Sequence, residues 1–221
     1  MHADLKLFMI YPRNPRLSAA KNKAIGVIVL AAGASRRMNE PKQLLTLDGK
    51  TLLRRAVETA IESVCRPVVV VLGANFERTK AEIEDLKVEI VFNDDWQAGL
   101  SSSIRTGIEN LLSSAPEIAA AVVTLADQSL VTAQHINLFA EKFEQSESAV
   151  IAAQYDETIG VPALFSRAVF DRLKTLSGDR GAKMIIEENR AALVAIDLPE
   201  AAFDIDTPQD FANLNFYRKR N

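Results

Sequence analysis

Uninterrupted apolar runs alternate along this chain with segments in which apolar residues recur at helical spacing. The first run, 25–30, contains no charged residue and predicts a strand that is covered on both faces. Further strands are predicted at 68–72, 88–92, 119–125, 149–153, 161–165 and 193–196. Since strands that alternate with helices at this spacing form βαβ units, we expect a mostly parallel sheet.

The segments between these runs predict helices. Thr51 is a candidate N-cap, and the apolar stripe that follows it extends to Val64. Other helices are predicted at 77–86, from 99, at 132–143, from 166 and from 178. The last helix starts from the capping sequence at 207–210 and is expected to bury Phe211 and Leu214. Residues 24–221 therefore predict one three-layer α/β/α domain with a Rossmann-like sheet.

Residues 1–23 differ from the rest of the chain in charge, because they hold five basic residues and one acidic residue. Their apolar piece, 7–11, is shorter than the core of a signal peptide, so we expect a loosely ordered basic arm. No apolar run reaches the roughly eighteen residues of a membrane span, so we expect no membrane-spanning segment.

Composition narrows the functional classes. A net charge of −3 disfavours a nucleic-acid partner, which usually meets a basic face. The single cysteine excludes an internal disulfide framework and suits a reducing compartment, so we expect a cytoplasmic protein in which Cys65 is buried. With one cysteine and two histidines, a zinc site built from those side chains is not expected.

Small and polar residues follow the predicted strands, at 32–42, 73–75, 93, 127 and, further on, 206. Ligands of parallel sheets bind outside the carboxyl ends of the strands, so these positions are expected to converge. The small residues of the first loop let a ligand approach the backbone, and Arg37 and Lys42 add positive charge, which predicts a polyphosphate site. Asp127 and Asp206 are candidate ligands of Mg²⁺, which prefers one or two carboxylates with phosphate oxygens.

The scarcity of histidine indicates the class of reaction. Only His2 and His135 are present, so no Ser-His-Asp or Cys-His set can be assembled. The P-loop pattern and G-x-G-x-x-G are also absent, which disfavours P-loop enzymes and nicotinamide dehydrogenases. Nucleotidyl transfer onto a phosphate needs positioning and charge stabilisation but no general base, because the attacking group is already ionised. We therefore expect nucleotidyl transfer rather than hydrolysis.

Six motifs occur in order over roughly residues 25 to 216. The first is Leu30-Ala31-Ala32-Gly33-x-Ser35-x-Arg37-Met38 with Pro41-Lys42, and the second is Gly99-Leu100-Ser101-Ser102-Ser103-Ile104-Arg105-x-Gly107. The others lie at 125–128, 160–165, 178–182 and 204–210. Together they resemble the nucleotidyltransferase family that includes the molybdenum cofactor cytidylyltransferases, which implies a fold of the nucleotide-diphospho-sugar transferase type.

The resemblance implies transfer of CMP from CTP to the terminal phosphate of molybdopterin, with Mg²⁺ as cofactor and release of pyrophosphate. It implies Arg37, Lys42 and Asp127 as catalytic residues, and Asp127 and Asp206 as metal ligands. The implied nucleotide-binding residues are Leu30, Ala31, Ala32, Gly33, Ser35, Gly73, Asn93, Ser101, Ser102 and Ser103. The implied acceptor-binding residues are Gln128, Gly160, Pro162, Gly178, Asp179 and Gly181. A molybdoenzyme or a chaperone is the implied protein partner.

Three positions bear on how closely the chain follows the family pattern. Ala32 stands where guanylyl-transferring members have glycine, and its methyl group favours a pyrimidine base. Asn39 replaces a glycine that is common after Arg-Met, and Ser129 replaces the proline that usually follows Asp-Gln.

Several alternatives stay open. Pro41-Lys42-Gln43 also occurs in methylerythritol cytidylyltransferases, so a cytidylyl- or uridylyltransferase acting on methylerythritol phosphate or a sugar phosphate is the second hypothesis. A non-catalytic carrier of nucleotide or cofactor is the third. Asp204 competes with Asp206 for the metal, and Ser101–Ser103 are alternatively only N-cap residues. Trp96 is expected to pack, or to stack on a ring near the site.

Overall fold

The computed structural model describes residues 23–38, 40–146 and 148–220, with side chains through residue 214. Apart from Lys23, the predicted basic arm lies outside the described residues, as does Asn39.

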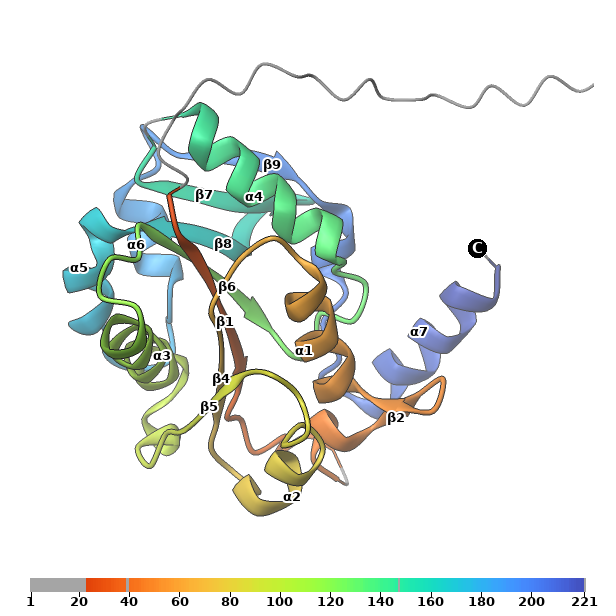
Figure 1. Cartoon of the computed structure of the whole chain (residues 1–221). Coiled ribbons are helices and arrows are strands. Elements are labelled where there is room, and N and C mark those ends of the chain that lie inside the picture. The colour runs from red at the N-terminus through yellow and green to blue at the C-terminus, as the bar shows by residue number, and fades with distance from the viewer. Residues whose placement is uncertain (1–22, 39, 147, 221) are drawn as a thin grey trace, which may run out of the picture.

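The described chain is built on a seven-stranded sheet with the order β5-β4-β1-β6-β8-β7-β9 (Figure 1). Its strands are β1 Ile25–Ala31, β4 Val68–Leu72, β5 Glu89–Phe92, β6 Ala120–Leu125, β7 Val150–Tyr155, β8 Thr158–Ser166 and β9 Val194–Asp197. Neighbouring strands are parallel except where β8 pairs antiparallel with β6 and β7. The expected mostly parallel sheet is confirmed, and the exception arises because the short turn Asp156-Glu157, rather than a helix, joins β7 to β8.

Helices cover both faces of the sheet and complete the three predicted layers (Figure 1). One face carries α1 Leu52–Glu62 and α4 Ala133–Gln145, and the other carries α3 Leu100–Ser114, α5 Phe170–Lys174 and α6 Lys183–Glu188. Alternate residues of β1 enter the two cores, with Val27 and Val29 on the first face and Ile28 on the second. All three are fully buried, which explains why this strand is a continuous apolar run.

Smaller elements complete the described chain. They are the hairpin of β2 Thr46–Leu47 and β3 Lys50–Thr51, α2 Phe76–Ala81, α7 Pro208–Arg220, and four 3₁₀ helices at Lys42–Leu44, Trp96–Ala98, Arg167–Val169 and Pro199–Ala202. Leu214 of α7 is buried beside Leu47 and Leu52, as predicted, and Phe211 packs against the same group. None of the helices in the described ranges has the length and hydropathy that a bilayer crossing requires.

Side-chain caps fix two helix starts. The Thr51 side chain accepts a hydrogen bond from the backbone N–H of Arg54 at 3.2 Å, which confirms the predicted N-cap of α1. Thr132 caps α4 in the same way, and His135 returns the contact by accepting from the Thr132 N–H through Nδ1 at 3.3 Å. His135 therefore forms part of the capping box at the N-terminus of α4.

Two predicted elements are wrong in extent. The apolar stripe of α1 does not reach Val64, which is 71% exposed, because the helix ends at Glu62 and the chain turns at Ser63. The helix predicted at 77–86 ends at Ala81, and turns lead from there to β5.

Candidate active site

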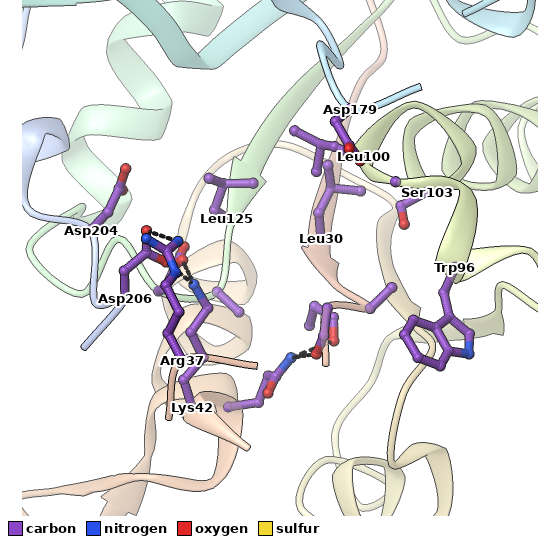
Figure 2. Close-up of a pocket in the computed structure, with 17 residues that line it drawn as sticks. Leu30, Arg37, Lys42, Trp96, Leu100, Ser103, Leu125, Asp179, Asp204 and Asp206 are labelled. Carbon is purple, nitrogen blue, oxygen red and sulfur yellow. Dashed lines mark hydrogen bonds and ion pairs between the residues drawn. The ribbon is translucent and has the colours of Figure 1, made fainter. Parts of the chain in front are cut away.

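A cavity of about 560 Å³ opens at the carboxyl ends of β1 and β6 (Figure 2). The predicted site residues that line it are Leu30, Ala31, Ala32, Gly33, Arg37, Lys42, Ser103, Asp127, Asp179 and Asp206. The predicted residues outside its lining are Ser35, Gly73, Asn93, Ser101, Ser102, Gln128, Gly160, Pro162, Gly178 and Gly181. The expected convergence of strand ends therefore brings the predicted cations and carboxylates to one cavity.

Four charged side chains at one end of the cavity pair with one another (Figure 2). Lys42 Nζ donates to Asp127 and, at 2.9 Å, to Asp206 Oδ1, while Arg37 donates to Asp206 Oδ2 at 2.6 Å. The Lys42 and Asp127 side chains are only 19% and 12% exposed, whereas Arg37 is 69% exposed. Solvent therefore weakens the Arg37 pair far more than the Lys42–Asp127 pair.

These contacts shift three pKa values. Burial by itself lowers the pKa of Lys42, but its attraction to Asp127 and their hydrogen bond outweigh burial and raise the pKa above its usual value. Burial by itself raises the pKa of Asp206, but the hydrogen bond from Lys42 and the charges of Lys42 and Arg37 hold that pKa below its usual range. Desolvation, followed by the charge of Asp127, raises the pKa of Asp204 to about 7. Asp204 and Asp206, which both line the cavity, thus have pKa values shifted in opposite directions.

Gln43 holds the loop after β1 in place through hydrogen bonds to its backbone. Its Nε2 donates to the carbonyl oxygens of Ala31 at 3.1 Å and Gly33 at 2.6 Å. Ser35, which adopts a φ of 54°, donates to Gln43 Oε1 at 3.1 Å and accepts from the Lys42 N–H at 2.9 Å. Ser35 thus holds the loop that carries Lys42, and the nucleotide contact that the resemblance implies for it remains a prediction.

Asn93 ties the end of β5 to the start of α3. Its Nδ2 donates to Ser102 Oγ at 2.8 Å and Ser103 Oγ at 3.0 Å, and all three side chains are buried. Ser103 alone of these three lines the cavity. Asn93 therefore positions the helix start that presents Ser103, and a direct nucleotide contact from Asn93 remains a prediction.

Gly73 allows three backbone segments to meet beneath the cavity. A Cβ at this position would lie 2.7 Å from the Ala32 carbonyl oxygen and 2.7 Å from Trp96 Cβ. The Ala74 N–H also donates to the Ala32 carbonyl at 3.0 Å. Gly73 therefore holds Trp96 against the loop after β1, and the indole of Trp96 lines the cavity.

The segment 178–181, here called the glycine loop, rests on the start of α3. The Gly178 carbonyl accepts from the Ser101 N–H at 3.3 Å. Gly99, with a φ of 93°, lies so close that a Cβ there would fall 2.0 Å from Asp179 Oδ1. These contacts place the Asp179 carboxylate at the cavity, at the end opposite Lys42 (Figure 2).

Gln128 connects the loop that carries Asp127 to β8 and to the 3₁₀ helix Pro199–Ala202. Its Nε2 donates to the carbonyl oxygens of Val161 on β8 at 2.9 Å and Ala201 at 3.0 Å. Gly160 and Pro162 lie on β8 outside the cavity lining. Gln128 thus ties the loop that carries Asp127 to the strand that holds Gly160 and Pro162, and the contact of these residues with an acceptor remains a prediction.

Asp127 and Asp206, the two carboxylates predicted to hold a divalent cation, lie close together at the cavity. Both carboxylates converge on one positive charge, the Lys42 ammonium. Within the described residues no group of three or more His, Cys, Asp or Glu side chains could hold a metal. Two carboxylates with space for phosphate oxygens fit Mg²⁺, which is rarely held by protein ligands alone.

Some lining residues have no role predicted from the sequence. They are Gln43, Gly99, Leu100, Leu125 and Ala126, while Asp204 is predicted only as a competitor of Asp206 and Trp96 only as a nearby ring. Gly99, Leu100, Leu125 and Ala126 all belong to motif segments that are named above. Motif membership was thus the signal that could have identified them.

Several known proteins are similar to this chain in sequence. A family model described as the MobA-like NTP transferase domain matches residues 27–193. The purine catabolism protein PucB of Bacillus subtilis (strain 168) is 30% identical over 203 residues, covering 85% of this chain and 93% of that protein. Nicotine blue oxidoreductase of Paenarthrobacter nicotinovorans is 28% identical, covering 85% and 94%. Molybdenum cofactor cytidylyltransferase of Escherichia coli (strain K12) is 23% identical, with the same coverage of both chains.

The fold also has solved counterparts. The crystal structure of Rv0371c from Mycobacterium tuberculosis H37Rv superposes with a TM-score of 0.77 at 26% identity, covering 87% of this chain and 97% of that one. A complex of Rv0371c with manganese superposes with a TM-score of 0.73 at 25% identity, covering 87% and 98%. The family model matches most of the described domain, and so the chain belongs to the MobA-like NTP transferase family of nucleotidyltransferases.

Proposed function

We propose that this protein transfers CMP from CTP to the terminal phosphate of molybdopterin and releases pyrophosphate. The observation that carries the proposal is the cluster of Lys42, Arg37, Asp127 and Asp206, in which two cations and two carboxylates meet beside the backbone loop after β1. This equipment suits charge stabilisation of a polyphosphate, and no histidine among the described residues lines the cavity. The similarity to the E. coli molybdenum cofactor cytidylyltransferase supports the choice of substrates.

The residues of the cluster divide the task by charge. Arg37 and Lys42 bind the negatively charged phosphate oxygens, and the backbone N–H groups of the loop after β1 surround them. An oxygen of the acceptor phosphate forms a new bond to the α-phosphorus, while the bond from the α-phosphorus to the bridging oxygen breaks and pyrophosphate leaves. Bound between Asp127 and Asp206, Mg²⁺ would neutralise developing charge on the phosphates. Lys42 lies beside both carboxylates, and its ammonium group can stabilise the negative charge that develops on the leaving pyrophosphate.

Base selection and delivery complete the proposal. The methyl group of Ala32 favours a pyrimidine base over guanine. The nucleotide-bearing product would pass to a molybdoenzyme or to a chaperone that serves one.

The test is an assay of pyrophosphate release with Mg²⁺, each of the four ribonucleoside triphosphates, and molybdopterin. We expect release with CTP and molybdopterin, and loss by orders of magnitude in Asp127→Ala. The matched control is Asp171→Ala, since Asp171 pairs with Lys174 at 2.7 Å on the surface and outside the cavity. Release with GTP in place of CTP would contradict the role of Ala32, and absence of release with any acceptor would leave a binding or carrier function.

A different phosphorylated acceptor is the second candidate. PucB and nicotine blue oxidoreductase are more similar to this chain than the cytidylyltransferase is, and their names describe other roles. The same assay with methylerythritol phosphate and with sugar phosphates separates this candidate from the first. Release with one of these compounds and not with molybdopterin would reassign the acceptor and keep the reaction.

A further inference from the structure

The cavity is chemically divided from one end to the other. Figure 2 shows Arg37 and Lys42 on one side and Trp96 and Asp179 on the other. Leu30 and Leu100 lie near Asp179, and Ser103 lies between Asp179 and the indole. A nucleoside triphosphate is divided in the same way, because its charge lies at one end and a flat ring at the other.

We propose that the Trp96 end binds the nucleobase and that Asp179 selects a base with an exocyclic amino group. The proposal rests on the nucleotidyl transfer proposed above and adds the residues that choose the base. The indole would stack on the ring, and the Asp179 carboxylate would accept a hydrogen bond from the amino group, as acidic side chains do with cytosine N4. Uracil presents a carbonyl oxygen at that position and would be repelled by the carboxylate.

Asp179 is placed for this task by its surroundings. Gly99 has no side chain, so the Asp179 carboxylate can lie directly over the start of α3, and the Gly178 carbonyl bonded to Ser101 holds the loop there. Neighbouring cations are engaged elsewhere, since Arg180 pairs with Glu187 at 2.7 Å and Arg105 with Asp95 at 3.1 Å. Among the described residues, Asp179 has no hydrogen-bond or ion-pair partner of its own.

Trp96 is fixed in a comparable way. Its Cβ packs on Gly73, and its carbonyl accepts from the Gly99 N–H at 3.2 Å. The same short segment thus links the indole and the seat of Asp179. In our proposal a base that enters beside the start of α3 lies between the indole and the carboxylate, with its ring toward Trp96 and its amino group toward Asp179.

Trp96 is the only tryptophan of the chain, so its fluorescence reports directly on this end of the cavity. The first experiment titrates the full-length protein with CTP and, separately, with inorganic tripolyphosphate, with Mg²⁺ present and no acceptor. We expect CTP to quench the emission to saturation, and tripolyphosphate to compete with CTP without quenching. Equal quenching by tripolyphosphate, or none by CTP, overturns the proposal. No turnover is needed, so failure of the proposed transfer is detected separately.

The second experiment measures CTP and UTP binding by calorimetry in Asp179→Asn and Trp96 variants. We expect wild-type protein to prefer CTP, and Asp179→Asn to reduce the ratio of the two affinities about tenfold. Asp171→Asn, a surface aspartate outside the cavity, should leave the ratio unchanged. Trp96→Ala should weaken CTP binding about tenfold and Trp96→Phe much less, since stacking needs an aromatic ring.

The outcome also decides whether the nucleotide or the acceptor places its ring at the Trp96 end of the cavity. An unchanged CTP to UTP ratio in Asp179→Asn, with weaker binding of molybdopterin alone, would assign the glycine loop to the acceptor and overturn the proposal. Thermal unfolding of each variant confirms that the fold is retained.

Discussion

Lys42 forms ion pairs with Asp127 and Asp206. The phosphates of a nucleotide would compete with these carboxylates for Lys42, and a metal ion would compete with Lys42 for the carboxylates. The variant Asp127→Asn tests this competition. The amide keeps the shape of the side chain and removes one of the two carboxylate charges that contact Lys42 Nζ. We expect Asp127→Asn to bind CTP more tightly than wild-type protein in the absence of metal. At the same time Mg²⁺ should lose most of its ability to strengthen CTP binding, because one of the two proposed metal ligands is gone.

The structure sets the size of the effect. At an effective dielectric constant of about 20, a charge pair separated by 2.9 Å, the distance from Lys42 Nζ to Asp206 Oδ1, attracts by about 6 kcal/mol. The contact with Asp127 is no longer than this one, and both of its side chains are largely buried. A phosphate oxygen restores most of the attraction, so the net gain is of the order of one charged hydrogen bond, about 1.5–3 kcal/mol. We therefore expect the affinity for metal-free CTP to rise at least about tenfold.

Isothermal titration calorimetry with CTP, in a chelator and then in Mg²⁺, measures both effects. Asp171→Asn is the matched control, because it removes the charge of an aspartate paired with a lysine, Lys174, on the surface. It should change neither value. If Asp127→Asn binds metal-free CTP no better than wild-type protein does, the Lys42–Asp127 pair does not compete with nucleotide and the reasoning is refuted.

Three further changes test the environment of the site. The pKa of Asp204 is raised to about 7 from 3.8, so the folded state retains a proton that the unfolded state has lost; stability should fall as pH rises from about 4 to about 7, and urea unfolding of Asp204→Asn should show a smaller fall. Ser129 Oγ is buried without a hydrogen-bond partner among the described residues, so Ser129→Ala should raise the free energy of unfolding by up to about 1 kcal/mol, and a marked loss would reveal a bonded hydroxyl. Gly73→Ala places a Cβ 2.7 Å from both the Ala32 carbonyl and Trp96 Cβ, and should cost about 1–3 kcal/mol in thermal unfolding, whereas an unchanged melting temperature would show that the three segments can separate.

The strands of the sheet were predictable where burial alone determines the pattern. β1 and β4 are buried along their whole length, and each is a continuous apolar run between polar segments. The direction of β8 was not predictable, because an apolar run carries no direction and the turn Asp156-Glu157 contains no glycine. The extent of α1 was overestimated because Val64 continues the apolar spacing after the helix has ended.

The cavity was predictable where a residue directly follows a strand. Lys42 and Asp127 come from loops after β1 and β6, so the rule of carboxyl ends brings them together. That rule does not predict the positions of Gln43 and Asp179 in the site. The part played by Gln43 depends on the path of a loop that folds back on Ala31, and the position of Asp179 depends on contact with Gly99, eighty residues earlier in the chain. Such contacts belong to tertiary structure and leave no local periodic pattern.

The reversed strand β8 has a consequence for how this family can diversify. Because β8 runs against β6, the turn between β7 and β8 projects past the same edge of the sheet from which the Asp127 loop emerges. Insertions or exchanges in that turn would add residues at the edge of the sheet where the cavity opens and leave the register of β1 with β4 and β6 intact. The turn between β7 and β8 can therefore change in length and sequence without altering the strands β1 and β6, whose following loops carry Lys42 and Asp127.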